Sequence, residues 1–366
     1  MPRKPQRSSQ LSHFFLKELA GEQPPSRATL QTLYPLAVEL LAREPWKRIA
    51  ESQLVLTQDP VSKETCYCSI MGTLGEVMSL HAYVGAESYR LFARLRSGEP
   101  TTIGDFYAGQ HAVYVQFVEL GELTPPDRDM LGAMGHELMR GSRAPLFRAV
   151  RPGYHAWYPT EEEAQTLIEC HRVVLAVCTL LDAKPGAGYW EEEEVYPLLS
   201  RPSPEAPWEI RPAKAPVSTV AMPQLPRLDE ERLQRIRARK LPARRVLEVD
   251  HFYGGGRVGK RHERKACIRI AVAIDAETAH VYPPVVSSPK EFTGDLLADA
   301  LLRAIEAGHA RPLEVHVRDR QFKILLDPLA LALGFPVKVV KNMPALDFAK
   351  SQLLSMMGDP GPIGPA

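Results

Sequence analysis

The stretch from Pro312 to Val340, "PLEVHVRDRQFKILLDPLALALGFPVKVV", decides the fold of the last third of the chain. Its first residues alternate between apolar and polar and end at Asp319. Apolar residues at helical spacing follow, and a second apolar run comes after Gly334. This pattern predicts a strand, a helix and a second strand. Strands joined through a helix must lie parallel and be crossed over right-handedly.

The residues before this stretch predict three strands in succession. The predicted strands are "RRVLEVDHF", "KACIRIAVAID" and "AHVYPPVV", and the glycine-rich segment "YGGGRVGKRHER" is expected to be a loop between the first two. Helices are predicted in "PKEFTGDLLADALLRAIEAG" and in "PALDFAKSQLLSMM". Sequential strands with short connections form antiparallel neighbours. The last third is therefore expected to join an antiparallel meander to a parallel pair.

This order of elements resembles that of the ribonuclease H-like superfamily, which includes integrases and transposases. The resemblance covers about Arg244 to Met357. It implies that the first and fourth strands are parallel neighbours. It also implies that acidic residues at their ends and on the last helix hold divalent metal ions. The fold class expected for the chain is α+β, with a mixed N-terminal α+β domain followed by a ribonuclease H-like mixed-sheet α/β domain.

Three aspartates are candidate catalytic and metal-ligating residues: Asp250, Asp319 and Asp347. Asp250 and Asp319 end the segments "VLEVD" and "VHVRD", and Asp347 stands in the last helix. Carboxylates one strand spacing apart, about 4.8 Å, repel each other unless a cation such as Mg²⁺ or Mn²⁺ lies between them. Each has a simpler interpretation, because Asp319 can cap a helix, Asp250 can be solvated and Asp347 can face water.

A basic segment lies beside Asp250. Residues 227–265 contain thirteen Lys and Arg but six Asp and Glu. Five of these cations are candidate nucleic-acid contacts on the predicted loop 254–265: Arg257, Lys260, Arg261, Arg264 and Lys265. Phosphate contacts need such charge. The alternative is an ordinary solvated hairpin tip.

Length and composition favour two domains of a soluble protein. The chain has 366 residues, 45% hydrophobic content and a net charge of +1, so a charge preference for partners must be local. The expected divisions are a mobile basic arm at 1–27, an N-terminal α+β domain at 28–200, a proline-rich linker at 201–226, the ribonuclease H-like domain at 227–357 and a disordered tail at 358–366.

The N-terminal half shows helix and strand signals but no catalytic motif. Thr160 and Glu163 form a capping box, so the acidic run Glu161 to Glu163 is interpreted as the start of a helix. Five scattered cysteines in apolar contexts indicate reduced thiols and a cytoplasmic protein. No apolar run of about 18 residues is found, and no membrane span is expected.

Two segments, "FRAVRPGYHAWYPTEEEAQTLIE" and "RPLEVHVRDRQFKILLDPLALALGF", are similar to an uncharacterised bacterial family that pairs two domains of unknown function. The resemblance spans most of Leu30 to Leu354 and implies no activity. The function expected is therefore a non-catalytic binding or regulatory module on a ribonuclease H-like scaffold, without a cofactor. The alternative is a nuclease or recombinase-like phosphodiester enzyme that uses Mg²⁺ or Mn²⁺ at Asp250, Asp319 and Asp347.

Overall fold

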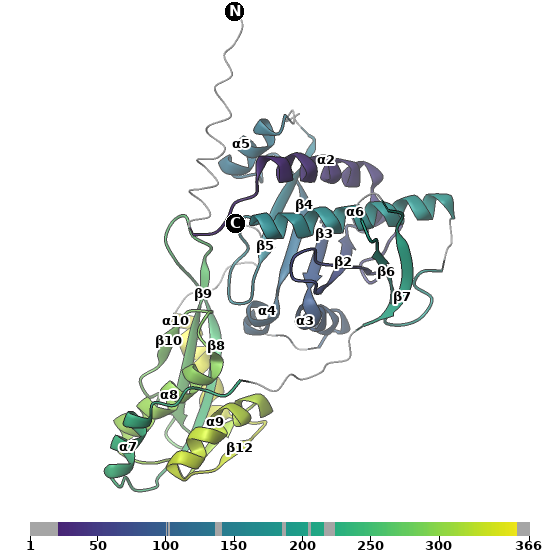
Figure 1. Ribbon diagram of the computed structural model, residues 1–366. Coiled ribbons are helices and arrows are strands. Elements are labelled where there is room, and N and C mark those ends of the chain that lie inside the picture. The colour runs from purple at the N-terminus through teal and green to yellow at the C-terminus, as the bar shows by residue number, and fades with distance from the viewer. Residues whose placement is uncertain are drawn as a thin grey trace, which may run out of the picture. The chain divides into compact units, whose positions relative to one another are not determined.

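The chain folds into two compact units, each with its own sheet (Figure 1). The computed structural model describes residues 21–99, 101, 103–135, 141–184, 188–203, 206–215 and 224–356. The first unit comprises Met1–Ser218 with Gly259–Lys265, and the second comprises Thr219–Val258 with Ala266–Ala366. The predicted α+β class in two parts is confirmed. Most of the predicted arm, and the predicted tail, lie outside the described residues.

The first unit is built on a seven-stranded sheet of order β5-β4-β3-β2-β1-β6-β7. Strands β1 to β5 are successive antiparallel neighbours, although helices lie between β3 and β4 and between β4 and β5, and β6 pairs in parallel with β1. The strands are β1 (Val55–Gln58), β2 (Thr65–Met71), β3 (Ser79–Val84), β4 (Ala112–Glu119), β5 (Arg143–Val150), β6 (Val195–Ser200) and β7 (Glu209–Lys214).

Helices cover both faces of this sheet. Helices α2 and α6 run side by side over one face, and α3 and α4 lie on the other (Figure 1). The core between sheet and helices includes Leu33, Phe117 and Leu167, all fully buried. The helices of the unit are α2 (Arg27–Arg43), the short 3₁₀ helix η1 (Pro45–Lys47), α3 (Gly85–Ser97), α4 (Ile103–Gly109), α5 (Pro125–Ala133) and α6 (Glu161–Ala183).

Helix α6 begins at the predicted capping box, which is confirmed. The Thr160 side chain accepts from the Glu163 N–H, and the Glu163 carboxylate accepts from the Thr160 N–H. Among the described residues, α6 alone is long and apolar enough to cross a membrane, but 61% of its apolar window is buried within the protein. It thus packs as a core helix of the first unit.

The second unit contains a five-stranded sheet of order β10-β9-β8-β11-β12. The first three strands are antiparallel, and β11 lies parallel to both β8 and β12. The predicted parallel pairing of the first and fourth strands is confirmed. The strands are β8 (Val246–Val258), β9 (Ala266–Asp275), β10 (Val285–Ser287), β11 (Glu314–Val317) and β12 (Val337–Val339).

Side chains alternate between two cores on the faces of the second sheet. Leu247 and Val249 of β8 pack with the helices α7, α8 and α9, whereas Phe252 packs with Leu346 and Ala349 of α10. The face of a β8 residue therefore decides which helices it meets. These helices are α7 (Glu230–Ala238), α8 (Thr293–Gly308), α9 (Arg320–Leu333) and α10 (Pro344–Met356).

Two predicted segments differ from the structure. Part of the predicted linker 201–226 is strand β7, which pairs with β6 at the edge of the sheet. Proline is tolerated there because an edge strand has one side without ladder hydrogen bonds, so Pro212 does not prevent pairing. The predicted arm is ordered from residue 21: Ser26 caps α2, and Glu22 accepts from Arg151 at 2.6 Å.

Candidate functional site

Asp250 lies inside a strand rather than at its end. Strand β8 continues to Val258 because the segment after Asp250 pairs with β9, with a register shift between Gly254 and Arg257. The expectation of a loop from Tyr253 onward was wrong over 253–258. The glycine run that suggested a loop accommodates a β-bulge instead.

The register between β8 and β11 determines which side chains meet. Glu314 pairs with Val246, and His316 pairs with Glu248. Continued past the end of β11 at Val317, this register would set Arg318 opposite Asp250 and Asp319 opposite His251. The charge of Arg318 does act on Asp250, and Asp319 caps α9, the helix that packs on the face of Leu247 and Val249.

Asp319 has the structural role that its position before a helix allows. It is the N-cap of α9, and its Oδ1 accepts from the Gln321 N–H at 2.7 Å. Its side chain is exposed. The capping interpretation is confirmed, and the carboxylate is engaged at the end of its own helix.

Asp347 lies in the first turn of α10 and is paired with an arginine. Arg318 Nη2 donates to Asp347 Oδ1 at 2.7 Å, with both side chains about half exposed. Arg318 thus reaches α10 from the face that Asp250 also occupies. A protein cation therefore stands where the sequence prediction expects a metal ion.

Asp250 is buried, with 7% of its surface exposed. Its pKa is raised to about 6, mainly by burial and also by the charge of Asp347, against the opposing effects of Lys350 and Arg318. Its Oδ1 accepts from the His251 N–H at 2.8 Å. The carboxyl group is therefore partly protonated near neutral pH.

Glu248 is a buried acid that the sequence analysis missed. It precedes Asp250 by two residues on the same face, and its Oε2 accepts from the Leu346 N–H of α10 at 2.6 Å. Burial raises its pKa. The sequence does contain a signal for Glu248. It lies two residues before Asp250 in an otherwise apolar strand, so the two acidic side chains are expected on the same face.

The predicted three-carboxylate metal site does not form. Within the part of the chain that the structure describes, no three His, Cys, Asp or Glu side chains gather closely enough to hold a metal ion. Asp319 is engaged as the cap of α9, away from Asp250 and Asp347, and the charges of Arg318 and Lys350 act on Asp250. The residues present therefore do not fit Mg²⁺ or Mn²⁺, which need several oxygen ligands from one site.

The predicted basic loop is only partly exposed. Arg264 is 8% exposed and belongs to the first unit, where Nη2 donates to Glu163 at 2.8 Å and Nη1 to the Ala149 carbonyl at 3.1 Å. Lys265 Nζ donates to the carbonyls of Gly259 and Lys260. Arg264 is therefore buried against the protein's own acceptors rather than exposed for a ligand, whereas nucleic-acid contact by Lys265 stays a prediction.

Glu163 connects this loop to the start of α6. Burial alone would raise the pKa of Glu163, but Arg264 and Arg151 lower it below its usual range. Arg151 Nε donates to Glu163 Oε1 at 2.7 Å. The carboxylate is thus ionised and shared between a helix cap and two guanidinium groups.

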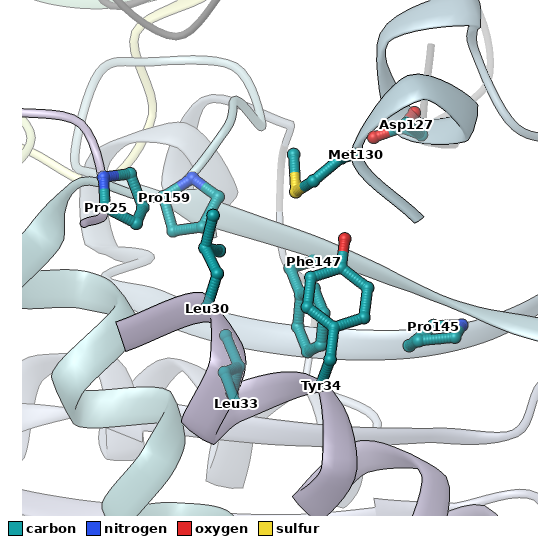
Figure 2. A pocket seen from close by; sticks show the side chains of 9 residues that line it. All are labelled: Pro25, Leu30, Leu33, Tyr34, Asp127, Met130, Pro145, Phe147 and Pro159. Carbon is teal, nitrogen blue, oxygen red and sulfur yellow. The ribbon is translucent and has the colours of Figure 1, made fainter. Parts of the chain in front are cut away.

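A cavity in the first unit is too small to be a ligand site. Figure 2 shows its apolar lining, with the hydroxyl of Tyr34 directed toward Met130 and Asp127. The Tyr34 ring packs edge-on against Phe147, with centroids 5.0 Å apart. The free space is about 10 Å³, which is close to the volume of one water molecule.

Comparison with known families divides the chain in two. Residues 31–197 match the family described as domain of unknown function DUF7309, and residues 232–354 match domain of unknown function DUF6930. No curated protein matches the chain. The predicted pairing of two domains of unknown function is confirmed.

Proposed function

Because the chain belongs to a family that joins two domains of unknown function, we propose its role from the geometry of the second unit. The proposed role is a non-catalytic binding or regulatory module on a ribonuclease H-like scaffold. The strand order, with the first strand central between the second and the parallel fourth, supports that scaffold.

One observation carries the proposal: Arg318 shares the face of Asp250 and is paired with Asp347. Both side chains of this pair are about half exposed, so solvent screening leaves it worth up to about 1 kcal/mol. The guanidinium nevertheless occupies the place beside Asp347 that a metal ion would need. Unlike a metal ion, it cannot bind and activate water for attack on a phosphodiester.

The test is a cleavage assay with labelled single- and double-stranded DNA and RNA in Mn²⁺, then in Mg²⁺. We expect no cleavage above a no-protein blank by the wild type, Asp250→Asn or Asp319→Asn. Cleavage by the wild type that disappears in Asp250→Asn but remains in Asp319→Asn would overturn the non-catalytic role. The second variant is a matched control because Asp319 lies on the other face.

The alternative function, a Mg²⁺- or Mn²⁺-dependent nuclease or recombinase-like enzyme, is favoured by a different observation. The charge of Asp347 acts to raise the pKa of both Asp250 and Glu248, so Asp347 lies near both acids. Three acids therefore face one region of α10. This alternative requires Arg318 to leave Asp347, and the cleavage assay decides between the two functions.

Nucleic-acid contact is proposed for the exposed part of the basic segment, Arg257, Lys260 and Arg261. Such contacts release counterions, so binding would weaken steeply with salt. Fluorescence anisotropy with a labelled oligonucleotide measures this slope. We expect a shallower slope in Lys260→Ala/Arg261→Ala than in wild type, and equal slopes would refute the contact.

We also propose a cytoplasmic location. All five cysteines are free and buried, which fits a reducing compartment.

A further inference from the structure

The second unit contains a buried arginine without a carboxylate partner. Arg269 of β9 is 3% exposed, and burial lowers its pKa. Nη1 donates to the Glu291 carbonyl at 2.7 Å, Nη2 contacts the Thr293 hydroxyl, and Nε has no partner. Over residues 224–356, no carboxylate lies within ion-pair distance of this guanidinium. The Glu291 charge acts on Arg269 without an ion pair, and the Tyr253 ring centroid lies 5.9 Å from its Cζ. Buried charges are normally paired directly, and Arg269 has no such counterion among the described residues.

Two further polar atoms without partners lie on the same face. Ser287 pairs with Arg269 across β10 and β9, is 9% exposed, and its Oγ makes no hydrogen bond to any described residue. Tyr253 of β8 is the cross-strand partner of Arg269, and His251 lies two residues before Tyr253 on the same strand. Its Nδ1 also lacks a partner, and its ring packs on Phe322. Buried polar groups are rarely left unsatisfied, and their grouping indicates a missing partner.

The N-terminus of helix α8 adds a second source of positive potential. Phe292 at the N-cap position offers no side-chain acceptor, and the first-turn carboxylate of Asp295 accepts from the Arg227 N–H. The Thr293 hydroxyl meets Arg269, so the guanidinium lies at this helix start. Unsatisfied N–H groups of a helix N-terminus and an adjacent arginine together favour an anion.

We propose that Arg269, Ser287 and the first turn of α8 bind the terminal phosphate group of a small phosphate ester. This inference rests on the proposed binding role and names its ligand class. A tetrahedral oxyanion matches a guanidinium, a hydroxyl and helix N–H groups, and would neutralise Arg269. The deep burial of Arg269 and Ser287 favours a terminal group over the backbone of a polymer. Ser288, Lys290 and Glu291 are exposed and mark the side of entry.

The experiment is isothermal titration of the full chain with inorganic phosphate and with adenosine monophosphate, at an ionic strength held constant with sodium chloride. We expect both to bind, and Ser287→Ala to bind each at least about tenfold more weakly, since it loses one hydrogen bond to a charged group. Ser288→Ala is the matched control, because its side chain is exposed beside the site. We expect it to bind as wild type does.

Equal affinities in wild type and Ser287→Ala, or no binding of either phosphate probe, would overturn the site. Competition by a single-stranded oligonucleotide without terminal phosphates would overturn the small-ester assignment and favour a nucleic-acid backbone. The cleavage assay on the same preparations separates the two proposals. If neither phosphate binding nor cleavage is observed, the phosphate site is refuted but the non-catalytic role is not. If cleavage is observed, the non-catalytic role is refuted whatever the titration gives.

Discussion

The two faces of the second sheet differ in how their charges are balanced. On the α10 face, the acids Asp250 and Asp347 meet Arg318 and Lys350. On the face toward α8, the buried Arg269 donates to a carbonyl, contacts a hydroxyl and lies over the Tyr253 ring, with no ion pair to a described carboxylate. The first face thus contains an ion pair between Arg318 and Asp347, and the second contains a buried cation without one. A search guided by acids alone therefore leads to the wrong face of this sheet.

The buried cluster of the first unit provides a reference for a fully balanced charge. Arg264 is as buried as Arg269 but has Glu163 at 2.8 Å. Arg264→Ala would leave Glu163 buried with less compensation, so we expect the unfolding free energy of the first unit to fall by about 3–5 kcal/mol. Urea denaturation followed by far-UV circular dichroism measures it.

The control for this variant is Arg261→Ala on the same loop. Its side chain is exposed, and its effect should stay within about 0.5 kcal/mol. Similar losses in the two variants would show that the Arg264–Glu163 pair does not stabilise the unit.

The pH dependence of stability sharpens the account of the α10 face. The pKa of Asp250 is raised from 3.8 to about 6, so the folded chain holds more protons than the unfolded chain between these values. Its contribution therefore lowers the unfolding free energy as pH rises through this range. Asp250→Asn removes the titration, and we expect its stability relative to wild type to improve by up to about 3 kcal/mol from pH 4 to pH 7.

Denaturant titrations at pH 4, 5, 6 and 7 measure this difference. Asp319→Asn serves as the control, since the exposed cap side chain should give no comparable pH trend. A constant difference between Asp250→Asn and wild type would mean that Asp250 has the same pKa in the folded and unfolded states.

Exchanging residues 318 and 319 is expected to change the charge balance of the α10 face. In Arg318→Asp/Asp319→Arg, the register places a carboxylate beside Asp250 and removes the guanidinium from Asp347. The exchange would then add a fourth carboxylate to the region that Glu248, Asp250 and Asp347 already face. We expect the variant to gain a Mn²⁺-dependent rise in Tm that wild type lacks. The gain is worth about 2.7 kcal/mol at a metal concentration 100 times the Kd.

Thermal unfolding with and without Mn²⁺ follows this gain, with Ca²⁺ and Na⁺ controls at equal ionic strength. The same rise in wild type, or none in the exchanged variant, would refute the importance of the one-residue register.

The smallest expected effect concerns the cap of α9. Asp319→Ala removes the acceptor for the Gln321 N–H, which costs about 1 kcal/mol, whereas Asp319→Asn preserves a good cap. The two unfolding free energies should differ by about that amount. If both variants lose several kcal/mol, Asp319 has a role beyond capping.

Much of the fold could be predicted because it follows from local patterns. Apolar periodicity predicts the strand and helix order of the last third, and the Thr160–Glu163 box predicts the start of α6. The parallel pairing of β8 with β11 follows from the order of the elements together with the resemblance to a known superfamily.

The errors arose where long-range pairing overrides local signals. The glycine run in β8 suggests a loop, but pairing with β9 makes it a bulged strand. The register between β8 and β11 depends on tertiary packing, and a one-residue difference moves Asp319 to the other face. Arg264 looks like an exposed cation because its partner, Glu163, is about a hundred residues earlier.

The most direct test of the central claim, that Arg318 neutralises the acids of the α10 face in place of a metal ion, is Mn²⁺ binding followed by electron paramagnetic resonance. Titration of the full chain with Mn²⁺ counts the bound ions. The account predicts that the free-ion signal grows with added Mn²⁺ as in buffer, in wild type and in Asp250→Asn alike. A stoichiometric loss of the free-ion signal with wild type, together with no such loss with Asp250→Asn, would contradict the account.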